Sequence, residues 1–314
     1  MSNYITKEEL SRFREQYELL LLSDVRLIDT IVRYLCRKKG KFLRPSLIIN
    51  VAKSLNSLNS KIYVGASLIE MIHLATLVHD DIVDESDLRR GWPTISRVWK
   101  NKVSLLIGDY IFSKSLSTVI KLDDIELIKI ISKAADSLSK GELMQFQGSK
   151  KRDMSEEMYY RMIKDKTASL FSAACELSAK ISSQNSKDVQ NFKKFGESFG
   201  MAYQIKDDID DVVGSYEELG KPTSLDLKRN MLTLPYIYCL GKLSSLEKAA
   251  FLIKIKKLSK RGRRKEIVKI VSDFGAIDYC KKKIAEHVFI CKESVSSYPK
   301  NEALVAIVDD VFKV

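Results

Sequence analysis

Proline is scarce in this chain. Five prolines occur in 314 residues, and each lies where a helical pattern begins or ends. The long stretches between them favour long helices. Alternating β-branched segments closed by Asn-Gly or Asp-Gly turns, which predict β-hairpins, are missing. Because no Pro/Gly/Ser-rich linker and no fixed-period repeat divides the chain, we predict a single all-α domain spanning residues 1–314.

Cysteine and histidine are also rare. The five cysteines are scattered without a CxxC pair, and the three histidines do not cluster with them. This spacing matches neither a zinc site nor a disulfide framework, and it predicts reduced thiols. The first residues lack the basic start and apolar run of a signal peptide, and the apolar run 19–22 is far shorter than a membrane span. We therefore expect a cytoplasmic protein.

Acidic residues are outnumbered, with 41 Asp and Glu against 53 Lys and Arg, which gives a formal charge of +12. This charge favours anionic partners. Eight of the cations lie between Lys254 and Lys265. Because no aromatic residue is interleaved with them, we do not expect nucleic-acid binding. A solvated helical corner is the first interpretation of this run, and contact with an anionic membrane surface is the second.

Apolar residues recur at helical spacing through most of the chain. In residues 62–83, Leu68, Ile72 and Ala75 follow one another at steps of four and three, as one face of a helix requires. The same periodicity runs through residues 97–120, 123–148, 155–181 and 187–213. With 45% apolar residues, these helices can bury a substantial core.

Two acidic boxes of the form DDxxD end two of the predicted helices. Asp80 and Asp84 bound the first box, and Asp207 and Asp211 bound the second. Residues four apart share a helix face, and negative charge at a helix C-terminus is unfavourable unless cations lie beside it. Magnesium prefers oxygen ligands and completes its shell with substrate phosphates. The two boxes therefore predict a clamp for a metal-bound diphosphate, whereas either box alone fits a solvated helix end equally well.

Cationic side chains accompany both boxes along the sequence. They are Lys41 and Arg44 in GKFLRP, His73 two helical turns before Asp80, Arg89 and Arg90 after the first box, and Lys166 and Lys221. Each of these residues alone is more often a surface charge than a phosphate ligand, so only the whole set indicates a binding site. Together they can stabilise the negative charge on a departing diphosphate. Motifs for other chemistry, such as GxSxG, a P-loop or HExxH, are missing.

At these residues the chain resembles the trans-isoprenyl diphosphate synthase (polyprenyl synthetase) family over residues 30–312. The shared motifs, in family order, are GKFLRP at 40–45, HDDIVDESDLRRG at 79–91, Lys166-Thr167, YQIKDD at 203–208 and GKP at 220–222 before Asp226. The resemblance implies an isoprenoid synthase fold, with long helices around a central active-site cavity. It also implies head-to-tail condensation of isopentenyl diphosphate with an allylic diphosphate by a homodimer.

The resemblance also implies a role for each site residue. Magnesium, as three ions with substrate bound, would be held by Asp80, Asp84, Asp207 and Asp211, with Asp81 and Asp208 acting directly or through waters. The allylic diphosphate would be held by Arg89, Lys166, Thr167, Gln204 and Lys221, and isopentenyl diphosphate by Lys41, Arg44, His73 and Arg90. The catalytic set would be Asp80, Asp81, Asp84, Arg89, Lys166, Asp207, Asp208 and Lys221. The departing pyrophosphate would be the base.

The residues upstream of the first box predict product length. Short-chain relatives carry bulky aromatics four and five positions before it, where this chain has Thr76 and Ala75. A tunnel could continue toward Ile72 and Met71, about 5.4 Å deeper per turn. We therefore expect a product longer than C20, hexa- to octaprenyl-like. If Ala75 is only a packing residue, the product is farnesyl or geranylgeranyl diphosphate.

Two rival functions keep the same fold. A non-catalytic partner subunit of a heteromeric synthase would be expected to have a degraded second box, which is intact here. A terpene cyclase would not need the isopentenyl-binding cations. The chain also departs from the family at Asn230-Met231, where relatives have Gly-Lys, and at Ser224, where they have Gly. We expect these departures to tune affinity and not to abolish activity.

Overall fold

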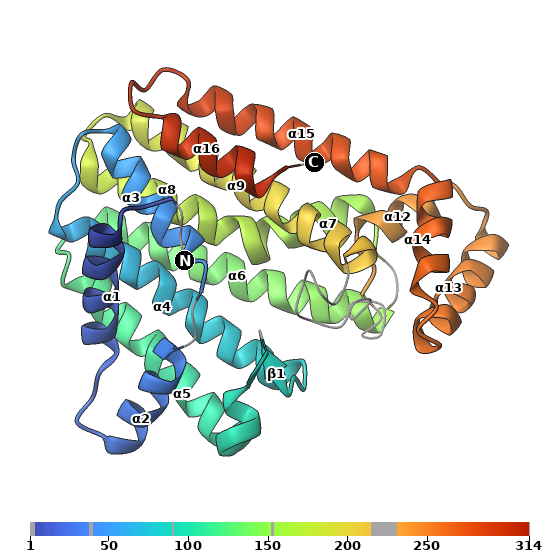
Figure 1. Cartoon of the computed structure of the whole chain (residues 1–314), viewed down its shortest axis with the longest axis horizontal. Coiled ribbons are helices and arrows are strands. Elements are labelled where there is room, and N and C mark those ends of the chain that lie inside the picture. The colour runs from blue at the N-terminus through green and yellow to red at the C-terminus, as the bar shows by residue number, and fades with distance from the viewer. Residues whose placement is uncertain (1–3, 38–39, 90, 152–153, 215–230, 314) are drawn as a thin grey trace. The chain divides into compact units, whose positions relative to one another are not determined.

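The structure is a computed structural model that describes residues 4–37, 40–89, 91–151, 154–214 and 231–313 (Figure 1). Within these ranges the regular structure is helical apart from one antiparallel pair of two-residue strands, β1 (Leu88–Arg89) and β2 (Trp92–Pro93). The prediction of an all-α protein is confirmed. The chain divides into two compact units, and the single-domain organisation stays a prediction.

The first unit comprises Met1–Ala135, Leu170–Gly196 and Ser294–Ile307. Its main helices are α1 (Lys7–Leu21), α2 (Arg26–Arg37), α3 (Leu43–Ser54), α4 (Ser60–Val83), α5 (Ile95–Ile120) and α8 (Ser169–Ser182). Four further helices contribute residues to both units: α6 (Ile125–Lys151), α9 (Ser186–Val213), α15 (Ala276–Val295) and α16 (Glu302–Val311). These bounds lie close to the predicted helical ranges.

The second unit comprises Asp136–Ser169, Glu197–Glu293 and Val308–Val314. Its own elements are α7 (Glu156–Ile163), the π-helix η1 (Lys164–Ala168), α12 (Leu234–Gly241), α13 (Ser245–Lys260) and α14 (Arg264–Asp273). The sequence pattern predicted one helix over residues 155–181. The structure instead places the five-residue π-helix η1 between α7 and α8, so the predicted helix is not regular throughout.

Helix α4 is the core helix of the first unit, where it contacts α1, α3 and α5. Leu68, Ile69 and Met71 are fully buried. Both α4 and α5 are long and apolar enough to cross a membrane, but 61% of the apolar window of α4 is buried inside the protein. Burial against α1, α3 and α5 accounts for the apolar composition of α4.

Polar caps fix where several helices begin. Thr6 and Glu9 form a capping box at α1, and the side chains of Asn59 and Thr94 accept hydrogen bonds from the first turns of α4 and α5. Each cap satisfies backbone N–H groups that have no partner within the helix. Asn59 and Thr94 therefore help to define where α4 and α5 begin.

Helix α5 is interrupted near its start. Lys100 has φ 75° and ψ 159°, which is a backbone conformation far from helical. This region of conformational space is adopted almost only by glycine. The helix predicted over residues 97–120 is therefore kinked in its first turns, at a position that no residue type in the sequence indicates.

Candidate active site

The first acidic box ends α4 in the first unit. Asp80 lies in the last turn, and Asp84 is the C-cap, whose backbone N–H donates to the carbonyl oxygen of Asp80 at 2.8 Å. Asp80 and Asp84 are half-buried, whereas Asp81 is only 6% exposed. The predicted position of the box at a helix C-terminus is confirmed, and its outer carboxylates remain accessible.

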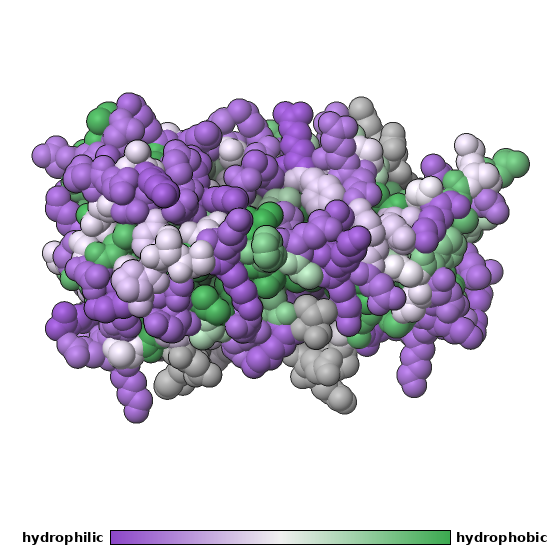
Figure 2. Space-filling view, turned by 90° about the horizontal axis from the view of Figure 1, so that it is seen from above, coloured by the Kyte–Doolittle hydropathy of each residue, from purple (hydrophilic) through white to green (hydrophobic). Residues whose placement is uncertain are grey.

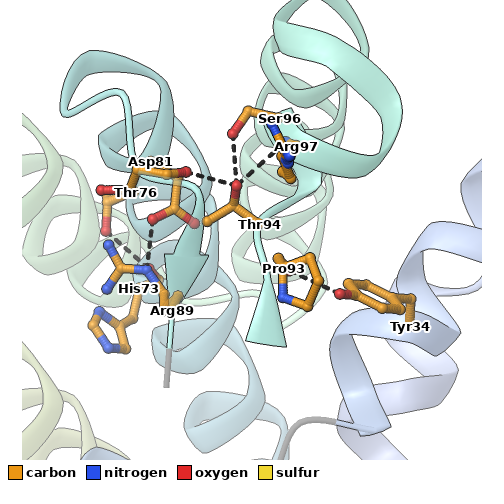
Figure 3. Close-up of polar contacts among 10 residues, drawn as sticks. Tyr34, His73, Thr76, Asp81, Arg89, Pro93, Thr94, Ser96 and Arg97 are labelled. Carbon is orange, nitrogen blue, oxygen red and sulfur yellow. Dashed lines mark hydrogen bonds and ion pairs between the residues drawn. The ribbon is translucent and has the colours of Figure 1, made fainter. Parts of the chain in front are cut away.

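The strand pair β1–β2 returns Arg89 to this box. Figure 3 shows the guanidinium of Arg89 directed at Asp81, and its Nε donates to Asp81 Oδ1 at 2.7 Å. Thr94, which follows β2, closes the segment between Ser86 and Thr94, because its hydroxyl donates to the carbonyl oxygen of Ser86 at 2.7 Å. Arg89 is thereby positioned by the box itself, next to the carboxylates that would bind metal.

His73, Thr76 and Asp80 lie at helical spacing on α4, and all three are half-buried. The hydroxyl of Thr76 donates to the carbonyl oxygen of His73 at 2.9 Å (Figure 3). The other predicted length-determining residues, Ala75, Ile72 and Met71, are at most 1% exposed. Thr76 is thus the one member of that set whose side chain shares the accessible side of α4 with the box.

The predicted isopentenyl-binding cations at the start of α3 differ in exposure. Lys41 is exposed before the helix, whereas Arg44 is half-buried in the first helical turn. The guanidinium carbon of Arg44 lies 4.1 Å from the centroid of the Phe171 ring. This distance fits a cation–π contact, which restricts the position of the side chain.

His79, next to the first box, packs against α5. Its Nε2 lies 3.3 Å from the carbonyl oxygen of Leu105 and 3.3 Å from a carboxylate oxygen of Asp109. Gly108 permits this approach, since a Cβ there would lie 2.1 Å from His79 Nε2. Helices α4 and α5 therefore approach each other closely at Gly108.

The second acidic box ends α9 in the second unit. Asp207 is exposed, whereas Asp208 and Asp211 are 3% and 4% exposed. Lys206 Nζ donates to Asp210 at 2.5 Å, so the intervening aspartate carries its own counter-charge. The accessible carboxylate of this box is therefore Asp207, and the two buried carboxylates contact the interior of the unit.

A chain of hydrogen bonds fixes Asp208. Its Oδ1 accepts from the side-chain amide of Gln204 at 2.8 Å, and its Oδ2 accepts from the Tyr159 hydroxyl at 2.6 Å. The amide oxygen of Gln204 in turn accepts from the Thr167 hydroxyl at 2.7 Å. Burial, and then the adjacent Asp208 charge, hold the pKa of Tyr159 well above its usual value. Tyr159 therefore remains protonated at neutral pH and donates its hydrogen bond to Asp208.

Lys166 and Thr167 lie in the π-helix η1. Such turns are frequent at functional sites, because the extra residue redirects side chains. Lys166 Nζ donates to Glu142 at 2.7 Å. Gly141 allows α6 to approach this closely, since a Cβ there would lie 2.3 Å from the backbone nitrogen of Lys166. The structure thus brings Lys166, Thr167, Gln204 and Asp208 together within the second unit.

Sequence reasoning missed three residues of this arrangement: Tyr159, Glu142 and Gly141. Only Gly141, a glycine inside a helical pattern, carries a local signal of close approach. Among the predicted site residues, Arg90 and Lys221 lie outside the described residues, as do Ser224 and Asn230 of the two departures. Met231 is described, and its sulfur accepts from the side-chain amide of Gln145 at 2.8 Å.

The donor set fits a hard divalent cation that binds together with its substrate. Among the described residues no three acidic, histidine or cysteine side chains form a preformed metal cluster. Magnesium is commonly held by one or two carboxylates, with waters and substrate phosphates completing its shell. The accessible Asp80, Asp84 and Asp207 can supply such ligands.

Comparisons with known proteins identify the family of the chain. A family model described as "Polyprenyl synthetase" matches residues 25–273. The all-trans-nonaprenyl-diphosphate synthase (geranyl-diphosphate specific) of Rhodobacter capsulatus is 31% identical over 91% of this chain and 88% of that protein. The crystal structure of a decaprenyl diphosphate synthase from Rhodobacter capsulatus has a TM-score of 0.90 and 29% identity, covering 98% of this chain and 96% of that one.

A second solved structure is equally similar in fold. The polyprenyl synthase of Caulobacter crescentus CB15, complexed with calcium and isoprenyl diphosphate, has a TM-score of 0.90 and 26% identity, covering 98% of this chain and 95% of that one. This chain belongs to the polyprenyl synthetase family. It is a prenyltransferase with an isoprenoid synthase fold, and the prediction of a long-chain trans-polyprenyl diphosphate synthase is confirmed.

Proposed function

We propose that this chain uses magnesium to condense isopentenyl diphosphate with an allylic diphosphate and extends the product beyond C20. The observation that carries the proposal is that each of the two DDxxD boxes ends a helix, with accessible carboxylates and a buried aspartate fixed by a neighbouring donor. Arg89 fixes Asp81, and Tyr159 with Gln204 fixes Asp208. A bound divalent cation would supply charge stabilisation for the leaving diphosphate.

In the second unit, Lys166 and Thr167 would bind the allylic diphosphate. The ammonium of Lys166 is paired with Glu142 in a half-buried position. An incoming diphosphate can share this ammonium, because a lysine has three donors. Gln204 accepts a hydrogen bond from the Thr167 hydroxyl and donates one to Asp208. A phosphate bound by the Thr167 hydroxyl would therefore be connected to the second box through Gln204.

In the first unit, Lys41, Arg44 and His73 would bind isopentenyl diphosphate, and Arg89 would contact the allylic diphosphate beside Asp81. Fixed cations that are already oriented need little reorganisation when charge develops on the leaving group. The cation–π contact of Arg44 and the Arg89–Asp81 ion pair provide this orientation. No covalent nucleophile is required for the reaction.

Substitution of the accessible box carboxylates tests the metal assignment. We expect Asp80→Ala and Asp207→Ala each to lower turnover by at least about a hundredfold, because each removes a charge that acts at the transition state. Asp136→Ala is the control, since this exposed aspartate pairs with Lys140 one turn away on α6. Turnover should also stop in a strong chelator and return with added Mg²⁺. Near-normal rates in either box variant, or in chelator, would refute the assignment.

Substitution upstream of the first box tests product length. Ala75→Phe should shorten the product, although a phenylalanine at this buried site is expected to destabilise the fold by about 1–3 kcal/mol. Thr76→Phe makes the same test at a half-buried position. The measurement is chromatography of products labelled from isopentenyl diphosphate. If both variants retain the product distribution of the unaltered chain, the floor of the tunnel lies elsewhere.

We further propose that the protein is a cytoplasmic homodimer that contacts the membrane peripherally to release its product. An apolar stripe on α5 supports the dimer, because Leu105, Leu116 and Ile120 are exposed at one-face spacing and Ile125 of α6 is exposed nearby in sequence. Sedimentation should give a dimer mass, and Leu105→Glu with Ile120→Glu should give a monomer. A monomeric unaltered chain would exclude the dimer.

A further inference from the structure

The helical hairpin formed by α13 and α14 is a surface feature of the second unit to which the reaction assigns no role. The two helices contact each other, and the Phe251 ring meets the Phe274 ring edge-on with centroids 5.8 Å apart. Ile255 and Val271 are buried on the inner side of the pair. Gly262, at φ +68°, permits the tight turn between the helices. The hairpin is therefore a packed element with a defined outer side.

The outer side of α13 is apolar over its first two turns. Leu246 and Ile253, seven residues apart, are 88% and 69% exposed, and Ala249 and Ala250 between them are exposed as well. This stripe lies opposite the buried residues Phe251 and Ile255 on the helical wheel. Figure 2 shows exposed hydrophobic side chains next to hydrophilic ones where the hairpin lies. Two large aliphatic side chains are thus held in solvent by a helix that has already buried its inner face.

A dense positive charge adjoins the apolar stripe. Residues 242–269 contain eleven lysines and arginines and two glutamates, a net formal charge of +9 out of the chain's +12. Lys254, Lys257 and Lys260 are exposed along the last turns of α13. Two of the arginines have partners within the second unit, since Arg263 pairs with Glu266 at the surface and Arg264 donates to the carbonyl oxygen of Val212. The exposed lysines of α13 carry outward-facing charge, and the exposed Arg261, Lys265 and Lys269 add to it.

We propose that the outer side of the α13–α14 hairpin docks on an anionic lipid bilayer. Leu246 and Ile253 would enter the boundary between headgroups and acyl chains, and Lys254, Lys257 and Lys260 would contact lipid phosphates. Exposed aliphatic side chains beside a row of lysines are the combination that binds anionic interfaces. The inference rests on the proposed function for its purpose, because a polyprenyl product must pass from the enzyme into lipid.

Two other partners fit this surface less well. A nucleic acid would use the charge, but it gains nothing from exposed Leu246 and Ile253, and the aromatic Phe251 that could stack with bases is 7% exposed. A second copy of the chain would bring two strongly basic surfaces together, which costs electrostatic energy. An anionic bilayer complements both the charge and the apolar stripe.

Vesicle co-sedimentation with the purified full-length protein tests the proposal. The unaltered chain should bind vesicles of phosphatidylcholine mixed with phosphatidylglycerol and should not bind phosphatidylcholine alone. Lys254→Gln, Lys257→Gln and Lys260→Gln together should weaken binding by about a hundredfold, at about fivefold per cation. The control, with the same loss of charge, is Lys7→Gln, Lys61→Gln and Lys187→Gln, three exposed lysines of the first unit.

A second pair of substitutions separates lipid insertion from charge attraction. Leu246→Ser with Ile253→Ser should weaken binding by about tenfold or more, whereas Leu19→Ser, at a 67% exposed position elsewhere, should not. Binding to labelled single-stranded RNA in place of anionic vesicles would overturn the proposal in favour of a nucleic acid. Equal binding by the hairpin variants and the unaltered chain, or no binding of anionic vesicles, would also overturn it.

Turnover separates this inference from the proposed function. None of the substituted residues belongs to the site, so all variants should keep the solution activity of the unaltered chain with short, water-soluble substrates. An unaltered chain that binds vesicles without turnover would contradict the proposed reaction alone. A chain that turns over normally without binding vesicles would contradict the hairpin assignment alone.

Discussion

Removal of the Tyr159 hydroxyl tests whether its hydrogen bond to Asp208 positions the second box. Tyr159 is fully buried, and it donates the 2.6 Å bond to Asp208, which is 3% exposed. A hydrogen bond to a charged group contributes about 1.5–3 kcal/mol, and the carboxylate left behind has no access to water that could replace it. We therefore expect Tyr159→Phe to lower the free energy of unfolding by about 2 kcal/mol.

The same substitution should also affect catalysis. Asp208 would lose the bond that holds its Oδ2 and keep the bond from Gln204 to its Oδ1, so its carboxylate can rotate and shift the adjacent Asp207 in the last turns of α9. A displacement that costs about 1.4 kcal/mol of transition-state stabilisation lowers kcat/KM about tenfold. The loss should appear in kcat more than in KM, because the fully buried Tyr159 would act through Asp208.

Urea unfolding followed by circular dichroism and steady-state kinetics would check both effects. Tyr110→Phe is the control, since that hydroxyl donates to the neutral carbonyl oxygens of Leu21 and Leu22, at 3.1 Å each, in the first unit. A double-mutant cycle with Asp208→Asn should give a coupling of at least about 1 kcal/mol between the two side chains. A coupling near zero, with unchanged unfolding and kinetics, would refute the positioning role.

Three further outcomes are expected. Gly141→Ala should cost about 1–3 kcal/mol and displace Lys166, lowering kcat/KM, whereas Gly241→Ala, with nothing within 4 Å, should be neutral. Lys100→Gly should stabilise the chain by about 1 kcal/mol in urea unfolding, because glycine adopts the φ of 75° without strain; a loss of stability would contradict this. Burial lowers the pKa of His287 below 6.5, so the unfolded chain binds the proton more readily and stability should fall as pH drops below 6.5. His287→Gln should flatten that dependence, and an unchanged slope would exclude His287 as its source.

The site was predictable wherever its residues carry a local pattern. The two boxes are five-residue motifs at the ends of apolar helices, so their metal-binding chemistry and their place on the helix could be predicted from spacing. Arg89 follows the first box closely in the chain, and the short strand pair can return it to Asp81 without help from distant residues. Lysines and arginines are common on protein surfaces, so their residue type alone does not identify a binding site. The roles predicted for them came from the resemblance to a known family.

The contacts that hold these residues in place were not predictable. Tyr159 lies 49 residues from Asp208, and Glu142 lies 24 residues from Lys166. A tyrosine or glutamate on a helix face has many structural uses, so neither residue type identifies its partner. The π-helix at Lys166 was not predicted either, because no residue type in this segment marks where the helix changes its hydrogen-bond pattern.

The sequence by itself determined the class of fold and the chemistry of the site, because helical periodicity, scarce proline and paired DDxxD boxes are local properties that a chain carries wherever it folds. Only the tertiary structure decided which box carboxylates are buried and which are accessible, and which side of the basic α13–α14 hairpin faces solvent. Burial and partner choice depend on side chains distant in sequence, whose packing no single segment encodes.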